Sequence, residues 1–179
     1  IYLGPDSSPL VPASAVCIEN GRVYGCSRQA FCVDLDTGKE IWRYGFAEKD
    51  GEISHLDEQF QVTPLVVDNR VFLVSWLVPY LVCLNAEDGK AVWKKVLRSP
   101  DFNTGFCYRP SYLQGRLYIS TNSSGLSCVD AGTGEILWFK GGSGRSWPTS
   151  TPPVIAGGKV YVGFHTGRGK MGGLACLDA

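Results

Sequence analysis

The sequence predicts an all-β fold built from about four repeated antiparallel sheets, and three observations support this prediction. A phrase of eleven residues that opens with cysteine and closes with tryptophan occurs three times, and a fourth copy reaches Ala179 before its turn is complete. The opening cysteines are 51, 45 and 48 residues apart, a period that indicates a repeat architecture. The 22 glycines and 10 prolines interrupt every stretch that could form an amphipathic helix of useful length.

The phrase itself predicts a β-hairpin that supplies the last two strands of each repeat. Its copies begin at Cys32, Cys83, Cys128 and Cys176, and the three complete copies end at Trp42, Trp93 and Trp138. A glycine in each complete turn can adopt a left-handed conformation without steric cost, namely Gly38, Gly89 and Gly134. A short polar side chain before each turn can hydrogen-bond to the turn backbone, namely Asp34, Asn85, Asp130 and Asp178.

A second hairpin is predicted upstream of each phrase. Its turns are centred on Asn20-Gly21, Asp68-Asn69, Gln114-Gly115 and Gly157-Gly158. A basic residue follows each turn, namely Arg22, Arg70, Arg116 and Lys159, and a nearly continuous apolar run comes next. Such runs suit strands that are covered on both faces. Four-stranded sheets that repeat at this period and cover one another form a β-propeller.

The predicted blades form one segment, residues 1–179, and span approximately residues 10–46, 61–97, 108–141 and 151–179. Residues 1–4 are expected to be the remnant of a preceding outer strand. The tryptophans of the phrase share one position early in the outermost strand, where a flat ring can fill the wedge between neighbouring sheets. We therefore expect blade docking to rest on the three tryptophans and the three turn glycines: Trp42, Trp93, Trp138, Gly38, Gly89 and Gly134.

The phrase resembles the pyrroloquinoline-quinone-like (PQQ-like) propeller repeat, whose hallmark is Ala-x-Asp-x-x-Thr-Gly-x-x-x-Trp. Cysteine replaces the alanine in every copy here, and Asp88 replaces the threonine in the second copy. The resemblance covers nearly the whole chain and implies the superfamily of quinoprotein alcohol dehydrogenases, which also holds lipoprotein propellers of the outer-membrane assembly machinery and many bacterial proteins. It also implies a periplasmic or extracellular location.

Rings in this family commonly have eight blades, so the resemblance implies that four repeats are part of a larger ring and of a longer polypeptide. Two alternatives stay open. A four-bladed ring could close with the amino-terminal strand completing the last blade, or two half rings could pair as a dimer. An open half ring would expose sheet faces and edges, which favours self-association.

Composition excludes several classes of partner. The 17 basic residues balance the 17 acidic ones, and no basic stripe suggests nucleic acid. No run of 18 apolar residues occurs, so we expect no membrane-spanning segment. The four repeated cysteines of the seven are expected to be buried and reduced, because equivalent positions on neighbouring blades lie too far apart to bond. Cys26 and Cys32 flank one hairpin, and free thiols are expected there too, because a turn at Arg28-Gln29 would place them diagonally.

Candidate functional residues lie in the long connections at one rim, about residues 45–61, 97–109 and 140–151, and in the loops between the middle strands. A basic and aromatic group there could hold an anionic or sugar ligand by guanidinium pairing and ring stacking: Arg109, Trp147, His165, Arg168 and Lys170. The acidic stretch 50–58 could bind a divalent cation, but a solvated loop is the favoured interpretation.

Three functions are compatible with the sequence. We favour a non-catalytic binding or scaffold propeller without a cofactor, because no nucleophile–base pair, metal cluster or cofactor motif is visible and no catalytic residue or metal ligand can be assigned. The partner would be another protein or a second copy, bound through the rim loops or an exposed blade edge. The alternatives are part of a PQQ- and calcium-dependent dehydrogenase, although the adjacent cysteine pair common in such enzymes is missing, and an accessory propeller beside a phosphoesterase or kinase domain.

Overall fold

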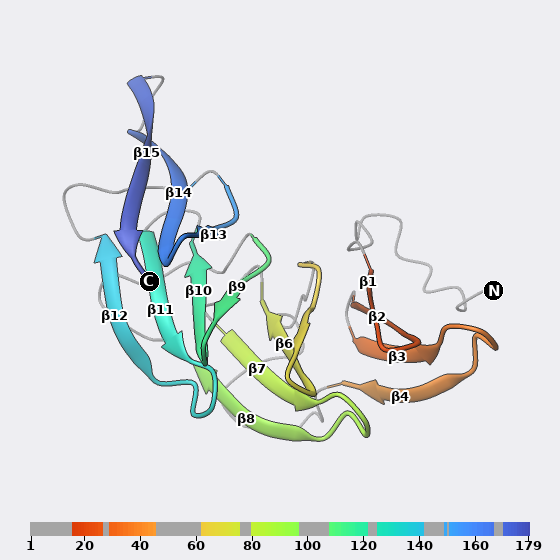
Figure 1. Ribbon diagram of the computed structural model, residues 1–179. Helices are drawn as coiled ribbons and strands as arrows, with labels where there is room; N and C mark the ends of the chain where they lie inside the picture. The colour runs from red at the N-terminus through yellow and green to blue at the C-terminus, as the bar shows by residue number, and fades with distance from the viewer. Residues whose placement is uncertain are drawn as a thin grey trace.

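The computed structural model describes residues 16–26, 29–45, 62–75, 80–96, 108–121, 125–141, 149 and 151–179 apart from 167–169, and for residues 165, 166, 170 and 171 it describes the backbone alone. These residues form strands and turns, which assemble into four antiparallel sheets that follow one another along an arc (Figure 1). The predicted all-β propeller fold is therefore confirmed. We call the sheets blades 1 to 4 in chain order.

Each blade is a meander in which strands that follow one another in the chain are hydrogen-bonded neighbours. Blade 1 contains β1 (Cys17–Glu19), β2 (Arg22–Cys26), β3 (Ala30–Asp34) and β4 (Glu40–Tyr44). Blade 2 contains β5 (Leu65–Val67), β6 (Arg70–Val74), β7 (Tyr80–Asn85) and β8 (Ala91–Val96). Blade 3 contains β9 (Ser111–Leu113), β10 (Arg116–Ser120), β11 (Gly125–Asp130) and β12 (Ile136–Gly141). Blade 4 contains β13 (Val154–Ala156), β14 (Lys159–Thr166) and β15 (Lys170–Asp178).

The turn between the first two strands of each blade lies where the sequence predicts it. Both central residues have positive φ, for example 49° and 71° at Asn20-Gly21 and 50° and 56° at Asp68-Asn69. Two positive φ values define a type I′ turn, whose twist matches that of the flanking strands. Glycine and asparagine tolerate this conformation, so the local sequence specifies the hairpin.

The turn between the last two strands is held by its polar residue. Asp34 accepts hydrogen bonds from the Thr37 backbone N–H at 2.8 Å and the Thr37 hydroxyl at 2.6 Å. Asp130 and Thr133 repeat this arrangement, and Asn85 accepts from the Glu87 N–H at 2.8 Å. Gly38, Gly89 and Gly134 have φ values of 67°, 70° and 76°. Asp178 differs, because its carboxylate forms an ion pair with Lys159 at 2.9 Å.

A β-bulge recurs in the outermost strand of blades 1, 2 and 3. The opening cysteine of each phrase pairs with the closing tryptophan, and the register then shifts by one residue. The extra residues of the three bulges are exposed apolar side chains, namely Ile41, Val92 and Leu137. A bulge increases the local twist and redirects the side chains beside it. Here it turns each tryptophan toward the next blade.

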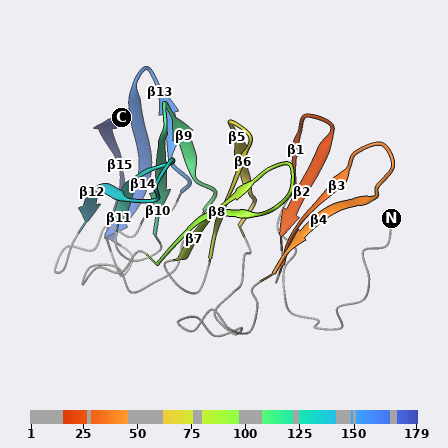
Figure 2. The same ribbon diagram turned by 90° about the horizontal axis from the view of Figure 1, so that it is seen from below.

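Three apolar cores lie between successive blades, whose sheets stand side by side (Figure 2). The apolar run of β6 shows how a middle strand serves two of them. Val71 and Leu73 belong to the core shared with blade 1, whereas Phe72 and Val74 belong to the core shared with blade 3. All four side chains are buried, which accounts for the nearly continuous apolar pattern.

The repeated cysteines lie in these apolar cores, with one exception. Cys32, Cys83 and Cys128 are fully buried thiols without a disulfide, and Cys26 beside Cys32 is also buried and donates its S–H to the Val62 carbonyl at 3.0 Å. The expectation that Cys176 is buried is wrong, because its side chain is exposed. In blades 1 to 3 the equivalent side chain is covered by the following blade and the outermost strand, and the described residues place neither beside Cys176.

Candidate functional site between neighbouring blades

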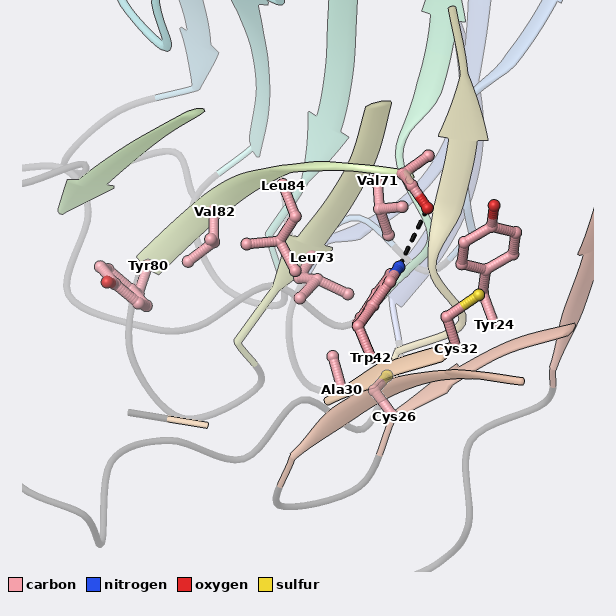
Figure 3. Packing of buried hydrophobic residues seen from close by; sticks show 11 residues of the cluster. Tyr24, Cys26, Ala30, Cys32, Trp42, Val71, Leu73, Tyr80, Val82 and Leu84 are labelled. Atoms are coloured by element: carbon pink, nitrogen blue, oxygen red, sulfur yellow. Dashed lines mark hydrogen bonds between the residues drawn. The ribbon is translucent and has the colours of Figure 1, made fainter. Parts of the chain in front are cut away.

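The phrase tryptophan of one blade reaches the backbone of the next blade. The Trp42 indole Nε1–H donates to the Ala86 carbonyl at 2.9 Å, and its ring lies 6.0 Å from the Tyr24 ring (Figure 3). Trp42 is 7% exposed. Trp93 repeats the contact, donating to the Ala131 carbonyl at 3.2 Å beside Phe72. Trp138 lies 6.0 Å from Tyr118 and packs against the core between blades 3 and 4.

The turn glycine of the following blade makes room for this ring. A Cβ built on Gly89 would lie 2.6 Å from the Trp42 ring, and one on Gly134 would lie 2.8 Å from the Trp93 ring. Both glycines also have positive φ, so two independent constraints favour glycine there. The tryptophan of one phrase and the glycine of the next therefore form one docking contact.

An arginine donates to the same carbonyl as the tryptophan. Arg22 Nη1 donates to Ala86 O at 2.8 Å, and Arg70 Nη1 donates to Ala131 O at 2.9 Å. Arg116 makes the equivalent bond to Ala179 O at 3.0 Å. We call an arginine and tryptophan that share one carbonyl of the next blade the inter-blade latch. Sequence reasoning noted the repeated basic residue after each turn but assigned it no role.

Two grooves open beside these latches. Groove 2–3, between blades 2 and 3, has a volume of about 290 Å³ and is lined by Val67, Asp68, Arg70, Phe72, Tyr112, Gly115, Ala131 and Gly132. The Tyr112 hydroxyl donates to the Asp68 carboxylate across it, and this bond raises the pKa of Tyr112. The Asp68 carboxylate is thereby engaged, whereas Arg70 forms no ion pair within the described residues. Its remaining N–H groups can donate hydrogen bonds to a ligand carboxylate.

Groove 1–2, between blades 1 and 2, occupies the equivalent place and has a volume of about 230 Å³. Three carboxylates, Glu19, Asp68 and Glu87, line it together with Arg22. The two grooves thus share the latch but differ in charge. Groove 2–3 suits an acidic group better, because carboxylates in groove 1–2 repel one.

The structure locates only part of the predicted rim site. The side chain of Arg109 is exposed, and its Nη2 lies 3.9 Å from the Cys17 Sγ of blade 1. Trp147 and Arg168 lie outside the described residues. The backbones of His165 and Lys170 lie at the same end of β14 and β15, where Thr166 pairs with Lys170. A shared ligand site for these five residues stays a prediction, and the acidic stretch 50–58 also lies outside the described residues.

The buried cysteines are poor nucleophiles. Burial raises the pKa of the Cys83 thiol to about 11, and it also raises the pKa values of Cys32 and Cys128. These groups are therefore neutral thiols at physiological pH, and the thiolate is the reactive form. The described residues contain no group of three or more histidine, cysteine or acidic side chains placed to hold a metal ion. They also contain no helix that could cross a membrane.

Comparisons with known proteins agree with this architecture. A family model described as outer membrane protein assembly factor BamB matches residues 28–178. Tetrathionate hydrolase of Acidithiobacillus ferrooxidans is 28% identical over 149 residues, which cover 75% of this chain and 28% of that protein. Quinohemoprotein alcohol dehydrogenase ADH-IIG of Pseudomonas putida is 27% identical over 119 residues, covering 60% of this chain and 16% of that protein.

Among solved structures, BamB from Moraxella catarrhalis superimposes with a TM-score of 0.67 and 17% identity, covering 92% of this chain and 46% of that one. This likeness concerns the fold. The chain spans less than a third of each of the two curated relatives and less than half of this solved structure.

Proposed function

This chain belongs to the PQQ-like propeller family whose model is described as outer membrane protein assembly factor BamB, and we propose that it acts as a non-catalytic scaffold that binds a protein partner. The observation that carries the proposal is the inter-blade latch. The arginine and tryptophan that the repeat supplies both donate to the backbone of a neighbouring blade. In the described residues, the chemistry of the repeat motif is therefore used to hold blades together.

Groove 2–3 is the proposed point of contact with the partner. Its arginine forms no ion pair with any residue that the structure describes, and the rings of Phe72 and Tyr112 line the same cavity. Such a groove fits an acidic side chain of a partner, bound by the Arg70 guanidinium with the apolar part of the chain against the rings. Groove 1–2 offers the matched comparison, because Arg22 has the same latch bond but more carboxylates surround it.

The name of BamB supports a protein as the partner, since that relative is an assembly factor for outer membrane proteins. The same name supports a periplasmic or extracellular location. We propose no resident cofactor, and PQQ with calcium is the competing assignment, which the similarity to quinoprotein alcohol dehydrogenases favours.

Two titrations test the proposal. A fluorescently labelled outer-membrane protein, diluted from urea, should bind the chain with a saturable change in anisotropy. Arg70→Gln should weaken this binding about tenfold, the equivalent of about 1.4 kcal/mol for one charge-assisted contact. Arg22→Gln removes the same kind of latch bond and should leave the affinity unchanged. Equal losses in the two variants would exclude groove 2–3 as the contact.

The second titration adds PQQ with calcium to the chain alone. We expect no change in the quinone absorbance and no shift of the melting temperature. A stoichiometric shift, together with no binding of the unfolded outer-membrane protein, would replace the scaffold proposal with the quinoprotein assignment.

A further inference from the structure

Arg70 differs from the basic residues at the equivalent positions of the other blades, because no carboxylate lies opposite it in the sheet. In those blades the basic residue pairs with an aspartate of the next strand, namely in Arg22–Asp34, Arg116–Asp130 and Lys159–Asp178. Arg70 pairs with Asn85, which carries no charge. Opposite charges that face each other across two strands attract. The positive charge of Arg70 is therefore not neutralised from the facing strand.

A carboxylate does lie in the same groove, but a tyrosine binds it. Among the described residues that line groove 2–3, Asp68 alone is acidic. The Tyr112 hydroxyl of blade 3 donates to this carboxylate of blade 2. That bond is the main cause of the raised pKa of Tyr112, and the charge of Arg70 acts on the same hydroxyl in the opposite direction. The three side chains thus lie within electrostatic range, while Asp68 and Arg70 form no ion pair.

The acid and the tyrosine occur together at this interface and not at the two equivalent ones. Asp68 is the first residue of the turn after β5, and Tyr112 is the middle residue of β9 in the following blade. The residues at these two positions are Asn20 and Val66 between blades 1 and 2, and Gln114 and Ile155 between blades 3 and 4. Neither of those pairs contains an acid or a hydroxyl. The hydroxyl donor is therefore present where the turn residue is an acid.

Without that hydroxyl, Asp68 would compete with any acidic ligand of Arg70. Carboxylates and guanidinium groups often form two parallel hydrogen bonds, and such a pair would occupy the N–H groups that a ligand requires. The Nη1 of Arg70 already donates to Ala131 O at 2.9 Å, so few donors are left to share.

We propose that Tyr112 determines the specificity of groove 2–3: its hydroxyl holds the Asp68 carboxylate and so leaves the Arg70 guanidinium available to an acidic group. The proposal rests on the function proposed above for this groove and assigns a role to a second residue in it. Tyr112 acts through Asp68 and is in this respect a positioning residue.

A small acid tests the proposal without a protein partner. The probe is 3-phenylpropionate, whose carboxylate matches the guanidinium and whose ring matches Phe72 and Tyr112. Titration into the 179-residue chain, followed by the NMR signal of the Arg70 Nε–H, gives the dissociation constant. We expect a saturable shift, and its absence from the unmodified chain would overturn the proposal.

Two substitutions separate the proposed role from a purely structural one, because both alter the bond between Tyr112 and Asp68. Tyr112→Phe keeps the ring and releases the carboxylate, so it should raise the dissociation constant about tenfold. Asp68→Asn removes the competing charge and should bind the probe at least as tightly as the unmodified chain. The double variant should bind like Asp68→Asn alone. A weaker affinity in Asp68→Asn, or a double variant as weak as Tyr112→Phe, would refute the proposal.

The matched control removes a tyrosine hydroxyl from the other groove. Tyr24 lines groove 1–2, and blade 2 has Phe72 at the equivalent position, so the repeat accommodates phenylalanine there. Tyr24→Phe should leave the affinity for 3-phenylpropionate unchanged. A loss equal to that of Tyr112→Phe would show that the effect does not depend on Asp68, against the proposal.

Binding of the unfolded outer-membrane protein reports separately on the scaffold function. If 3-phenylpropionate follows the expected pattern and that protein does not bind, Tyr112 keeps its role and the scaffold proposal fails. If the protein binds through Arg70 but Tyr112→Phe and Asp68→Asn weaken 3-phenylpropionate equally, the role of Tyr112 is refuted and the scaffold proposal stands.

Discussion

Replacing Gly89 by alanine tests the docking contact between blades 1 and 2 directly, because a matched glycine exists elsewhere in the chain. Gly89 has a φ of 70° and Gly21 has a φ of 71°. A Cβ on Gly89 would lie 2.6 Å from the Trp42 ring, whereas a Cβ on Gly21 would meet nothing within 4 Å. The two substitutions share the backbone strain and differ in the contact with the indole.

The free-energy cost of each substitution follows from the backbone strain and, for Gly89→Ala, from the contact with the indole. An alanine at left-handed φ costs about 1–2 kcal/mol at either site. Overpacking against a well-packed ring costs about 1–3 kcal/mol more, and this term applies only to Gly89→Ala. We therefore expect Gly89→Ala to lower the free energy of unfolding by about 1–3 kcal/mol more than Gly21→Ala. For a domain of this size that difference corresponds to roughly 2–12 °C in melting temperature.

Urea denaturation of four variants measures the effect and identifies its cause. The variants are Gly89→Ala and Gly21→Ala, each in the unmodified chain and in a Trp42→Ala background. Removing the indole should abolish the difference between the two glycine substitutions, since only the backbone strain is left. If the two cost the same while Trp42 is present, or if the difference survives its removal, the docking contact is not what favours glycine at position 89.

Further predictions concern the tryptophans, the cysteines and the turn carboxylates. Trp42→Ala should cost about 3–5 kcal/mol in urea denaturation and Trp93→Ala less, because the second ring is only partly buried; the reverse order would contradict the burial argument. Iodoacetamide at pH 8 should alkylate exposed Cys176 in the native chain and spare Cys83, whose pKa is raised to about 11. Mass spectrometry of the peptides measures both modifications, and faster alkylation of Cys83 would contradict the burial argument. The hydrogen bonds from Thr133 hold the pKa of Asp130 below its ordinary value. The ionised Asp130 side chain therefore stabilises the folded state above about pH 4, and this contribution is lost as the pH falls through the lowered pKa of Asp130. Asp130→Asn should therefore make the melting temperature less dependent on pH below about 4, and an unchanged acid profile would refute this.

The fold was predictable because local and global signals in this chain agree. Residue pairs such as Asn20-Gly21 specify type I′ turns, and Asp34 and Gly38 specify the second hairpin through hydrogen bonds within a few residues. The apolar run Val71–Val74 then indicates a strand covered on both sides. Each of these features depends on nearby sequence, and the period supplies the order of the blades.

The inter-blade latch was not predictable in the same way. Whether a basic residue at the start of a strand points to solvent or donates to a carbonyl about 60 residues away depends on how two sheets meet. The repeated placement of Arg22, Arg70 and Arg116 was the available signal, but a basic residue after a turn is also common on exposed hairpins. The exposure of Cys176 was missed for a related reason, since repeat equivalence predicts burial only where a following blade is present.

Packing between blades explains why a cysteine can stand where the family pattern has alanine. In blade 2 this cysteine pairs with Trp93 across the sheet and lies in one core with Phe72, so its sulfur fills space under an aromatic contact. Burial keeps the thiol protonated, and the nearest equivalent thiol belongs to another blade. The position is therefore a packing position, and under the proposed scaffold function the residues that select a partner are those that differ between repeats. Groove 2–3 and groove 1–2 differ in this way, because both contain a latch arginine but are lined by different numbers of carboxylates.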